Sequence, residues 1–110
     1  MVKSKTDLFN PEIKECAELF KALSHPARIA ILTYLAETKT CITGDISDEL
    51  PLSRTTVNQH LAELKRTGFI QGHVEGVHTK YCLRPDNIRR MRRMSDELFA
   101  QIETDGNHEC

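Results

Sequence analysis

The chain of 110 residues suits one domain, and its 39% hydrophobic and 28% charged residues are typical of globular proteins. It has no tryptophan, two tyrosines and four phenylalanines, so the core is expected to be largely aliphatic. The N-terminal sequence lacks the apolar stretch of a secretory signal, and no apolar run approaches the roughly 18 residues of a membrane span, which predicts a cytosolic (cytoplasmic) protein with no membrane partner.

Charge is unevenly distributed along the chain, although the net charge is only −1. Residues 52–93 contain nine Lys or Arg and three acidic residues, a local charge of +6, whereas the remainder has a charge of −7. Because a polyanion responds to the local field, the basic segment is a candidate nucleic-acid-binding module.

Two helices and a strand are predicted in the first 43 residues. Asn10-Pro11 opens a helix over about residues 11–23, in which apolar residues recur at three- and four-residue spacing. Pro26 suits the first turn of a second helix, with Ser24 or His25 as its cap, and residues 38–40 end it. Residues 41–43 are β-prone and predict a single edge strand.

The next segment has the pattern of a helix-turn-helix. A third helix is expected over about residues 44–50, and Pro51 ends it. The following link has the length of a helix-turn-helix turn, and Ser53 is a suitable N-cap for a fourth helix over about residues 54–67.

A hairpin and a last helix complete the pattern. Residues 69–74 and 79–83 are β-prone and flank a turn, and Pro85-Asp86 starts a fifth helix over about residues 86–103. The order helix, helix, strand, helix, helix, hairpin, helix predicts a mainly α winged helix-turn-helix, a single domain over residues 1–110 whose hairpin is the wing.

The fourth predicted helix is expected to read DNA in the major groove. Projected at about 100° per residue, Val57, Leu61 and Leu64 form an apolar face that would pack on Ile46 and Leu50. The opposite face has short or forked hydrogen-bonding side chains, which suit base edges. The predicted DNA-contacting residues, including flanking phosphate contacts and one wing lysine, are Ser53, Arg54, Thr55, Thr56, Asn58, Gln59, Lys65, Arg66 and Lys80.

Several of these residues also fit a purely structural role without DNA contact. The polar side of the fourth helix is equally that of an ordinary amphipathic helix, and Lys80 equally a solvated strand lysine. His60 lies at the edge of the apolar stripe and is expected to pack or cap locally rather than to touch DNA. The run Arg89 to Arg93 is expected to be mainly a solvated helix face.

Three stretches resemble the arsenic-repressor (ArsR/SmtB) family of bacterial transcriptional regulators. They are residues 20–32 (FKALSHPARIAIL), 52–64 (LSRTTVNQHLAEL) and 68–70 (GFI), and the resemblance covers about residues 12–84. It implies a homodimer built on the first and fifth helices, which represses transcription and releases its double-stranded DNA operator when an effector binds. The apolar stripes of those two helices independently supply a dimer face.

The family's metal sites match only in part. One arsenic-type site resembles C-x-C followed closely by Asp; here Cys41 and Asp45 match, but Thr43 stands where a second thiolate is expected. The zinc-type site on the last helix requires histidines, and Asp96 to Glu103 contains none, so that site is predicted to be absent.

The four cysteines, Cys16, Cys41, Cys82 and Cys110, form no C-x-C or C-x-x-C pair, which in a cytosolic chain favours free thiols. In winged helices the short strand before the third helix pairs with the second wing strand, which brings Cys41 beside Cys82. We hypothesise that this pair senses an oxidant or binds a soft metal or metalloid. Two small buried hydrophobes are the alternative, and Cys16 is expected to pack in the core or dimer face.

An enzyme is not expected. The sequence has no nucleophile-and-base constellation and no glycine-rich phosphate loop. The alternatives to an effector-released repressor are a winged-helix regulator without a metal site and, from a different class, a thiol-based metal carrier or redox protein.

Overall fold

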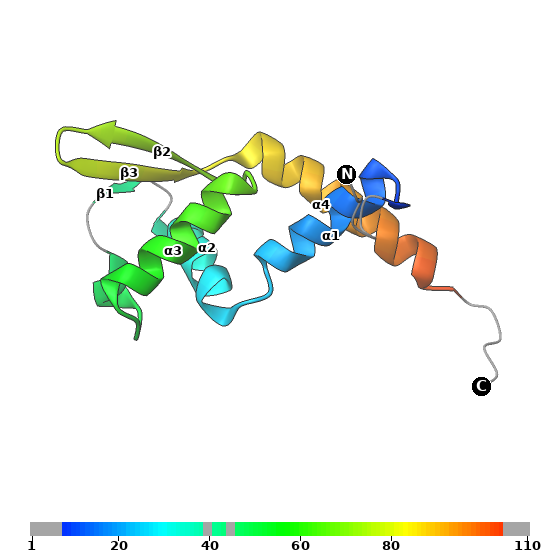
Figure 1. The fold of residues 1–110 in the computed structure, drawn as a ribbon, viewed down its shortest axis with the longest axis horizontal. Helices are drawn as coiled ribbons and strands as arrows, with labels where there is room; N and C mark the ends of the chain where they lie inside the picture. Colours follow the sequence, from blue (N-terminus) through cyan, green and yellow to red (C-terminus); the bar gives the residue numbers. More distant parts are fainter. Residues whose placement is uncertain (1–7, 39–40, 44–45, 105–110) are drawn as a thin grey trace.

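Four α-helices, a short 3-10 helix and three strands follow one another in the computed structural model, which describes residues 8–38, 41–43 and 46–104 (Figure 1). In chain order they are α1 (Pro11–Ala22), α2 (Pro26–Thr38), β1 (Ile42–Thr43), η2 (Ile46–Glu49), α3 (Arg54–Arg66), β2 (Ile70–Glu75), β3 (His78–Leu83) and α4 (Pro85–Ile102). This order confirms the predicted winged helix-turn-helix.

The prediction of five helices is wrong for the third one. Residues 46–49 form the 3-10 helix η2, while residues 44–45 lie outside the described part of the chain. The segment is short, and Pro51 follows closely; because proline lacks an amide hydrogen and clashes with the preceding turn, an α-helix cannot continue through it. The fifth predicted helix is therefore α4.

The predicted helix starts are confirmed by their capping hydrogen bonds. The Asn10 side chain accepts from the Ile13 amide at 2.8 Å, and Pro11 follows in the first turn of α1. His25 Nδ1 accepts from the Ala27 amide at 3.0 Å at the start of α2. These local bonds fix where the chain changes direction between helices.

The three strands form an antiparallel sheet in the order β1-β3-β2, so β1 is an edge strand, as predicted. Ile42 pairs with Tyr81, and Ile70 pairs with Leu83. The hairpin turn contains Gly76, whose φ of 61° is a conformation that glycine adopts without a steric cost.

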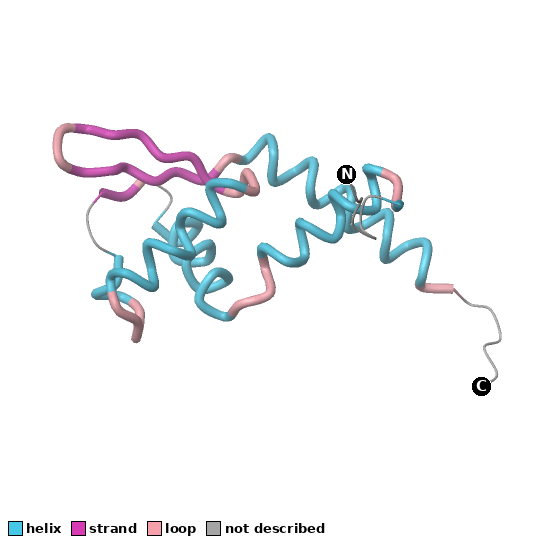
Figure 2. The backbone as a smooth tube through the Cα atoms, in the orientation of Figure 1, coloured by secondary structure: helices cyan, strands magenta, loops and turns pink. Residues whose placement is uncertain are grey.

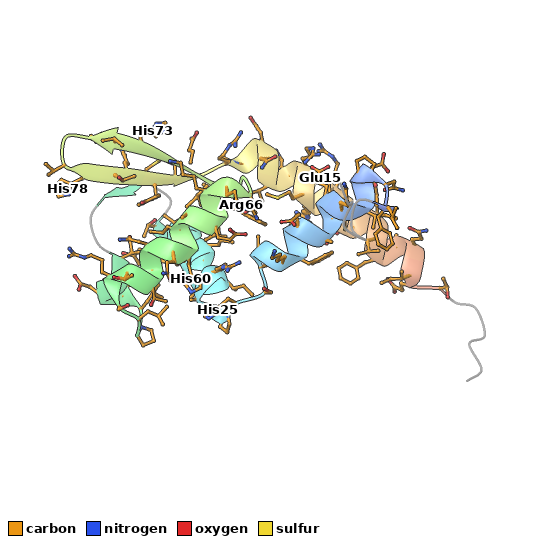
Figure 3. All side chains as sticks on the ribbon, in the orientation of Figure 1. Glu15, His25, His60, Arg66, His73 and His78 are labelled. Atoms are coloured by element: carbon orange, nitrogen blue, oxygen red, sulfur yellow. A yellow bond between two sulfur atoms is a disulfide. The ribbon has the colours of Figure 1, made fainter. Side chains whose placement is uncertain are left out.

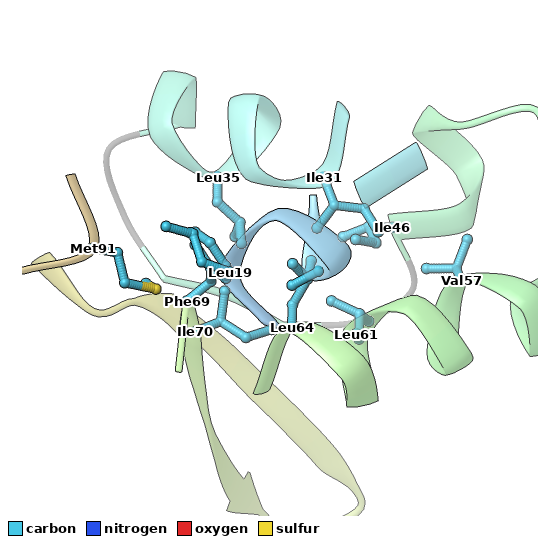
Figure 4. Packing of buried hydrophobic residues seen from close by; sticks show 11 residues of the cluster. Leu19, Ile31, Leu35, Ile46, Val57, Leu61, Leu64, Phe69, Ile70 and Met91 are labelled. Carbon is cyan, nitrogen blue, oxygen red and sulfur yellow. The ribbon is translucent and has the colours of Figure 1, made fainter. Parts of the chain in front are cut away.

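Buried side chains from α2 and α3 meet in a largely aliphatic core (Figure 4). Ile31 and Leu64 are completely buried. The rest of the buried cluster adds side chains from α1, η2, β2 and α4, and consists of Leu19, Ala22, Leu35, Ile46, Val57, Leu61, Phe69, Ile70 and Met91. The core thus holds α3 against α2 and the base of the hairpin.

Helices α1 and α4 pack on one another at the end of the molecule opposite the hairpin tip (Figure 2). Phe20 and Phe99 meet edge to face with ring centroids 6.1 Å apart. The radius of gyration is 17.1 Å, whereas a compact chain of this length has about 13 Å, so this helix pair makes the molecule elongated. Among the described residues, no helix has the length and apolar character of a membrane span.

Candidate nucleic-acid interface

Helix α3 presents one polar face to solvent and one apolar face to the core. Val57, Leu61 and Leu64 are at most 3% exposed, whereas Thr55, Asn58 and Gln59 are exposed. The amphipathic pattern predicted from the sequence is therefore confirmed. Accessibility is the first requirement for contact with base edges; the contact itself stays a prediction.

The start of α3 is held in place by its cap and by the preceding turn. Ser53 Oγ accepts from the Thr56 amide at 3.2 Å, and its hydroxyl donates to Thr56 Oγ1 at 3.0 Å. The 3-10 helix η2 packs against α3, with Ile46 buried and Leu50 packed on the same core. The helix-turn-helix thus fixes α3 with its polar face outward.

The predicted phosphate contacts lie on the flanks of this face. Arg54 is exposed at the first turn, where the amide groups of a helix also favour an anion. Lys65 is exposed on the last turn, and its Nζ lies beside β2, 3.6 Å from the position that a Cβ would take on Gly72. Lys80 on the wing is half-buried.

Arg66 is held apart from the other predicted contacts. Arg66 (Figure 3) is roughly 16 Å along the helix from Thr55. Its guanidinium donates to Glu63 at 2.6 Å and to Glu18 of α1 at 3.1 Å. The hydrogen bond from Arg66 lowers the pKa of Glu63, and both carboxylates raise the pKa of Arg66. Its predicted place near the bases requires it to exchange these carboxylates for DNA.

His60 lies inside the protein, as expected from its place beside the apolar stripe. It is 8% exposed, accepts at Nδ1 from Arg28 Nε at 3.1 Å, and lies against His25 with ring centroids 4.4 Å apart (Figure 3). Burial, then the nearby His25 and Arg28, lowers the pKa of His60. Its Nε2 has no hydrogen-bond partner among the described residues.

Arg28 connects three elements around this histidine. Besides His60 on α3, its guanidinium donates to the carbonyl oxygens of Lys21 and Ala22, each at 3.2 Å. This link was not predictable from the sequence, because Arg28 and His60 are 32 positions apart and no local pattern connects them.

Cys41 and Cys82 form a disulfide, with Cα atoms 4.5 Å apart. The prediction of free thiols is therefore wrong for this pair, whereas the predicted proximity is confirmed. The register that pairs Ile42 with Tyr81 brings Cys41 directly opposite Cys82, at the separation of a non-hydrogen-bonded antiparallel pair. Cys16 is half-buried and unbonded, and Cys110 lies outside the described residues.

The side chains present do not match a resident metal site. Within the described ranges, no three His, Cys, Asp or Glu side chains are grouped as metal ligands. Cys41 is bonded to Cys82, and Asp45 lies outside the described residues, so the arsenic-type donor set is not assembled. A thiolate site at Cys41 requires reduction of the disulfide first.

The arginine run on α4 behaves as a solvated face. Arg89 pairs with Asp86 on its own helix, and Arg90 pairs with Glu15 of α1. The guanidinium groups are half-exposed or more, and exposed ion pairs of this kind stabilise a fold by at most about 1 kcal/mol.

Comparison with known proteins agrees with this architecture. A family model described as a helix-turn-helix domain matches residues 23–73. An HTH-type transcriptional regulator of Methanocaldococcus jannaschii is 34% identical over 85 residues, which are 77% of this chain and 96% of that protein. The HTH-type transcriptional repressor SmtB of Mycobacterium tuberculosis is 38% identical over 95 residues, 86% of this chain and 62% of that protein.

A solved structure shows the same fold. An ArsR-like transcriptional regulator from Rhodococcus sp. RHA1 superposes with a TM-score of 0.66 at 26% identity, covering 79% of this chain and 81% of that one. The matched part of this chain is longer than residues 23–73. The chain therefore belongs to the ArsR/SmtB family of winged helix-turn-helix DNA-binding transcriptional regulators, and it is not an enzyme.

Proposed function

We propose that the protein is a homodimeric, sequence-specific transcriptional repressor whose α3 reads the major groove of its operator. The observation that carries this proposal is the exposed face of Thr55, Asn58 and Gln59, directly opposite the buried Val57, Leu61 and Leu64. A rigidly packed helix with such side chains meets the geometric needs of direct readout. Repression is supported by the similarity to SmtB, which is named as a transcriptional repressor.

Each predicted residue has a place in this proposal. Asn58 and Gln59 can bond an adenine edge bidentately, with Thr55 beside them and Arg66 at the far end of the helix. Phosphate contacts fall to the flanking residues Ser53, Arg54, Thr56, Lys65 and Lys80.

The second copy of the chain is proposed to cover the exposed apolar residues of α1 and α4. Ile13, Phe99 and Ile102 are 55%, 52% and 61% exposed, and Phe99 packs on Phe20 between the two helices. Exposed apolar side chains on two helices that pack together suit a symmetric helix interface. A dimer places two copies of α3 on a palindromic operator with half-sites about one helical turn apart.

The proposed effector acts on the Cys41–Cys82 pair and is an oxidant or reductant. A soft metal or metalloid bound by the two reduced thiolates is the alternative, and a regulator without a metal site is the third possibility. The proposed location is the cytoplasm, where the DNA partner of a prokaryotic regulator is found.

Selection of DNA from a random duplex library tests the proposed function. We expect enrichment of one palindromic sequence, which then serves as the operator duplex. Gln59→Ala is expected to weaken its binding by about 1 to 3 kcal/mol, roughly five- to 150-fold. Gln101→Ala, which removes the same exposed amide from α4, is the matched control and leaves the affinity unchanged.

Two results would contradict the proposal. Equal losses of operator affinity for Gln59→Ala and Gln101→Ala would show that α3 is not the helix that contacts the DNA. Failure to enrich any sequence, together with stoichiometric binding of Cu(I) or As(III) by the reduced protein, would favour a thiol-based carrier.

A further inference from the structure

We propose that Cys41 and Cys82 are a reversible modification site that controls how firmly the wing is fixed to the helix-turn-helix, the disulfide form being the tighter DNA binder. This inference rests on the proposed DNA-binding function and names its regulation.

The disulfide lies on the outer face of the sheet, where small molecules reach it. Tyr81 and Leu83 of β3 pack against the core, and side chains alternate along a strand, so Cys82 between them projects to the other side. Its neighbour across β2 on that side is the exposed Gln71, and both cysteines are half-buried rather than enclosed. A structural disulfide inside the core would lack this access.

The bond joins the wing to the segment that leads into the helix-turn-helix. Cys41 directly precedes β1, and η2, which packs against α3, begins at Ile46 shortly after β1 ends. Apart from the disulfide, the described attachment of β1 to β3 consists of the register pairs Ile42 with Tyr81 and Thr43 with Lys80. A two-residue edge strand is a weak attachment.

The modification is an ordinary thiol–disulfide exchange. One cysteine thiolate attacks a sulfur of a low-molecular-weight disulfide, forming a mixed disulfide and releasing one thiolate of the reagent. The second cysteine thiolate then attacks the protein sulfur of that mixed disulfide and releases the other reagent thiol. The protein dithiol loses two electrons and two protons, and the reagent disulfide becomes two thiols; a dithiol reductant reverses the exchange.

The direction of control follows from preorganisation. In the disulfide form, β3 of the wing is covalently joined to the segment that leads into η2, so less conformational freedom of that segment is lost when the wing and α3 contact DNA. In the dithiol form this freedom must be removed on binding, in both subunits of a dimer. We therefore expect reduction to weaken operator binding about tenfold.

The test measures operator affinity at fixed salt for the reduced and the oxidised protein. The dithiol reductant and the low-molecular-weight disulfide prepare the two forms, and alkylation with intact mass counts their free thiols. Cys41→Ser and Cys82→Ser are expected to bind with the lower affinity under both conditions. Cys16→Ser, which removes the half-buried unbonded thiol of α1, is the matched control and keeps the full difference.

Equal affinities of verified dithiol and disulfide forms, or tighter binding by the dithiol form, would overturn the inference. Persistence of the difference in Cys41→Ser would do the same. Absence of operator binding in every form and variant would instead overturn the proposed function, and this inference with it.

Discussion

Gly68 and Gly76 both have a positive φ, but their surroundings differ. At Gly68, with φ of 91°, a Cβ would lie 2.2 Å from Asn87 Nδ2, the atom that donates to the Gly68 carbonyl at 2.7 Å. At Gly76, with φ of 61°, a Cβ would meet nothing within 4 Å. The first position combines backbone strain with loss of the hydrogen bond between α4 and the turn that follows α3, and the second has backbone strain alone.

Alanine at these two glycines therefore has different costs. We expect Gly68→Ala to lower the free energy of unfolding by at least about 2 kcal/mol and Gly76→Ala by about 1 kcal/mol. Urea denaturation of the two variants measures both values. An equal effect at the two positions would contradict the described contact with Asn87.

His60 makes stability depend on pH. Its pKa is lowered in the folded state, chiefly by burial and then by His25 and Arg28, so the unfolded chain binds a proton first as the pH falls. This contribution to stability is fully present above the ordinary value of 6.5 and is lost as the pH falls through that value toward the lowered pKa.

We expect the midpoint of urea unfolding to fall between about pH 7.5 and about pH 5.5, and to fall less in His60→Gln. His73→Gln, which replaces an exposed wing histidine, is the control with the wild-type dependence. If His60→Gln kept the full pH dependence, the dependence would belong to other groups.

At the scale of elements, α3 is limited at its start by Ser53 and at its end by the turn at Gly68. Ser53 accepts the Thr56 amide, which has no carbonyl partner within the helix. We expect Ser53→Ala to lower the free energy of unfolding by about 1 kcal/mol and Ser53→Asn to preserve it, as measured by urea denaturation. Equal losses in both variants, or no loss in Ser53→Ala, would contradict this role of the side-chain oxygen.

The sequence predicted these elements well where local chemistry determines them. Caps at Asn10 and Ser53, the apolar stripe of α3 and the hairpin all follow from neighbouring residues. The extent of η2 was not predictable to the residue, because a few residues before a proline fit an α-helix or a 3-10 helix equally well in a pattern.

Side-chain partners distant in sequence were not predictable. Arg66 and Glu18 are 48 positions apart, so the helix pattern showed Arg66 only as an exposed cation. The proximity of Cys41 and Cys82 followed from the strand order of the fold, but composition and cysteine spacing favoured free thiols. Only the described register, with Cys41 opposite Cys82, brings their side chains within bonding distance.

At the scale of the whole molecule, the two ends have separate proposed tasks. The hairpin and α3 lie together at one end for DNA, and α1 and α4 extend from the other for a second copy (Figure 1). The charge distribution agrees, since residues 52–93 are basic within a chain of net charge −1. The Arg66 bridge to Glu18 and the Asn87 bond to Gly68 connect the two ends.

If the dimer forms through α1 and α4, a charged side chain introduced on these helices disrupts it, whereas one introduced on the wing does not. We expect Ile13→Glu to convert the dimer to a monomer, because a carboxylate in an apolar interface loses its hydration. Val77→Glu replaces an aliphatic side chain that is 94% exposed at the wing tip and is expected to leave the dimer intact. Analytical ultracentrifugation distinguishes these outcomes, and a monomeric wild-type protein would contradict the proposed interface.

The most direct test of the central claim, operator recognition by α3, is the affinity of the purified protein for the selected duplex and a scrambled duplex over a series of salt concentrations. We predict a preference of at least about a thousandfold for the selected duplex, and a steep fall of both affinities with salt as phosphate contacts release counterions. Gln59→Ala should reduce the preference while keeping the salt dependence. Equal affinity for the two duplexes, or binding that does not change with salt, would contradict operator recognition by α3.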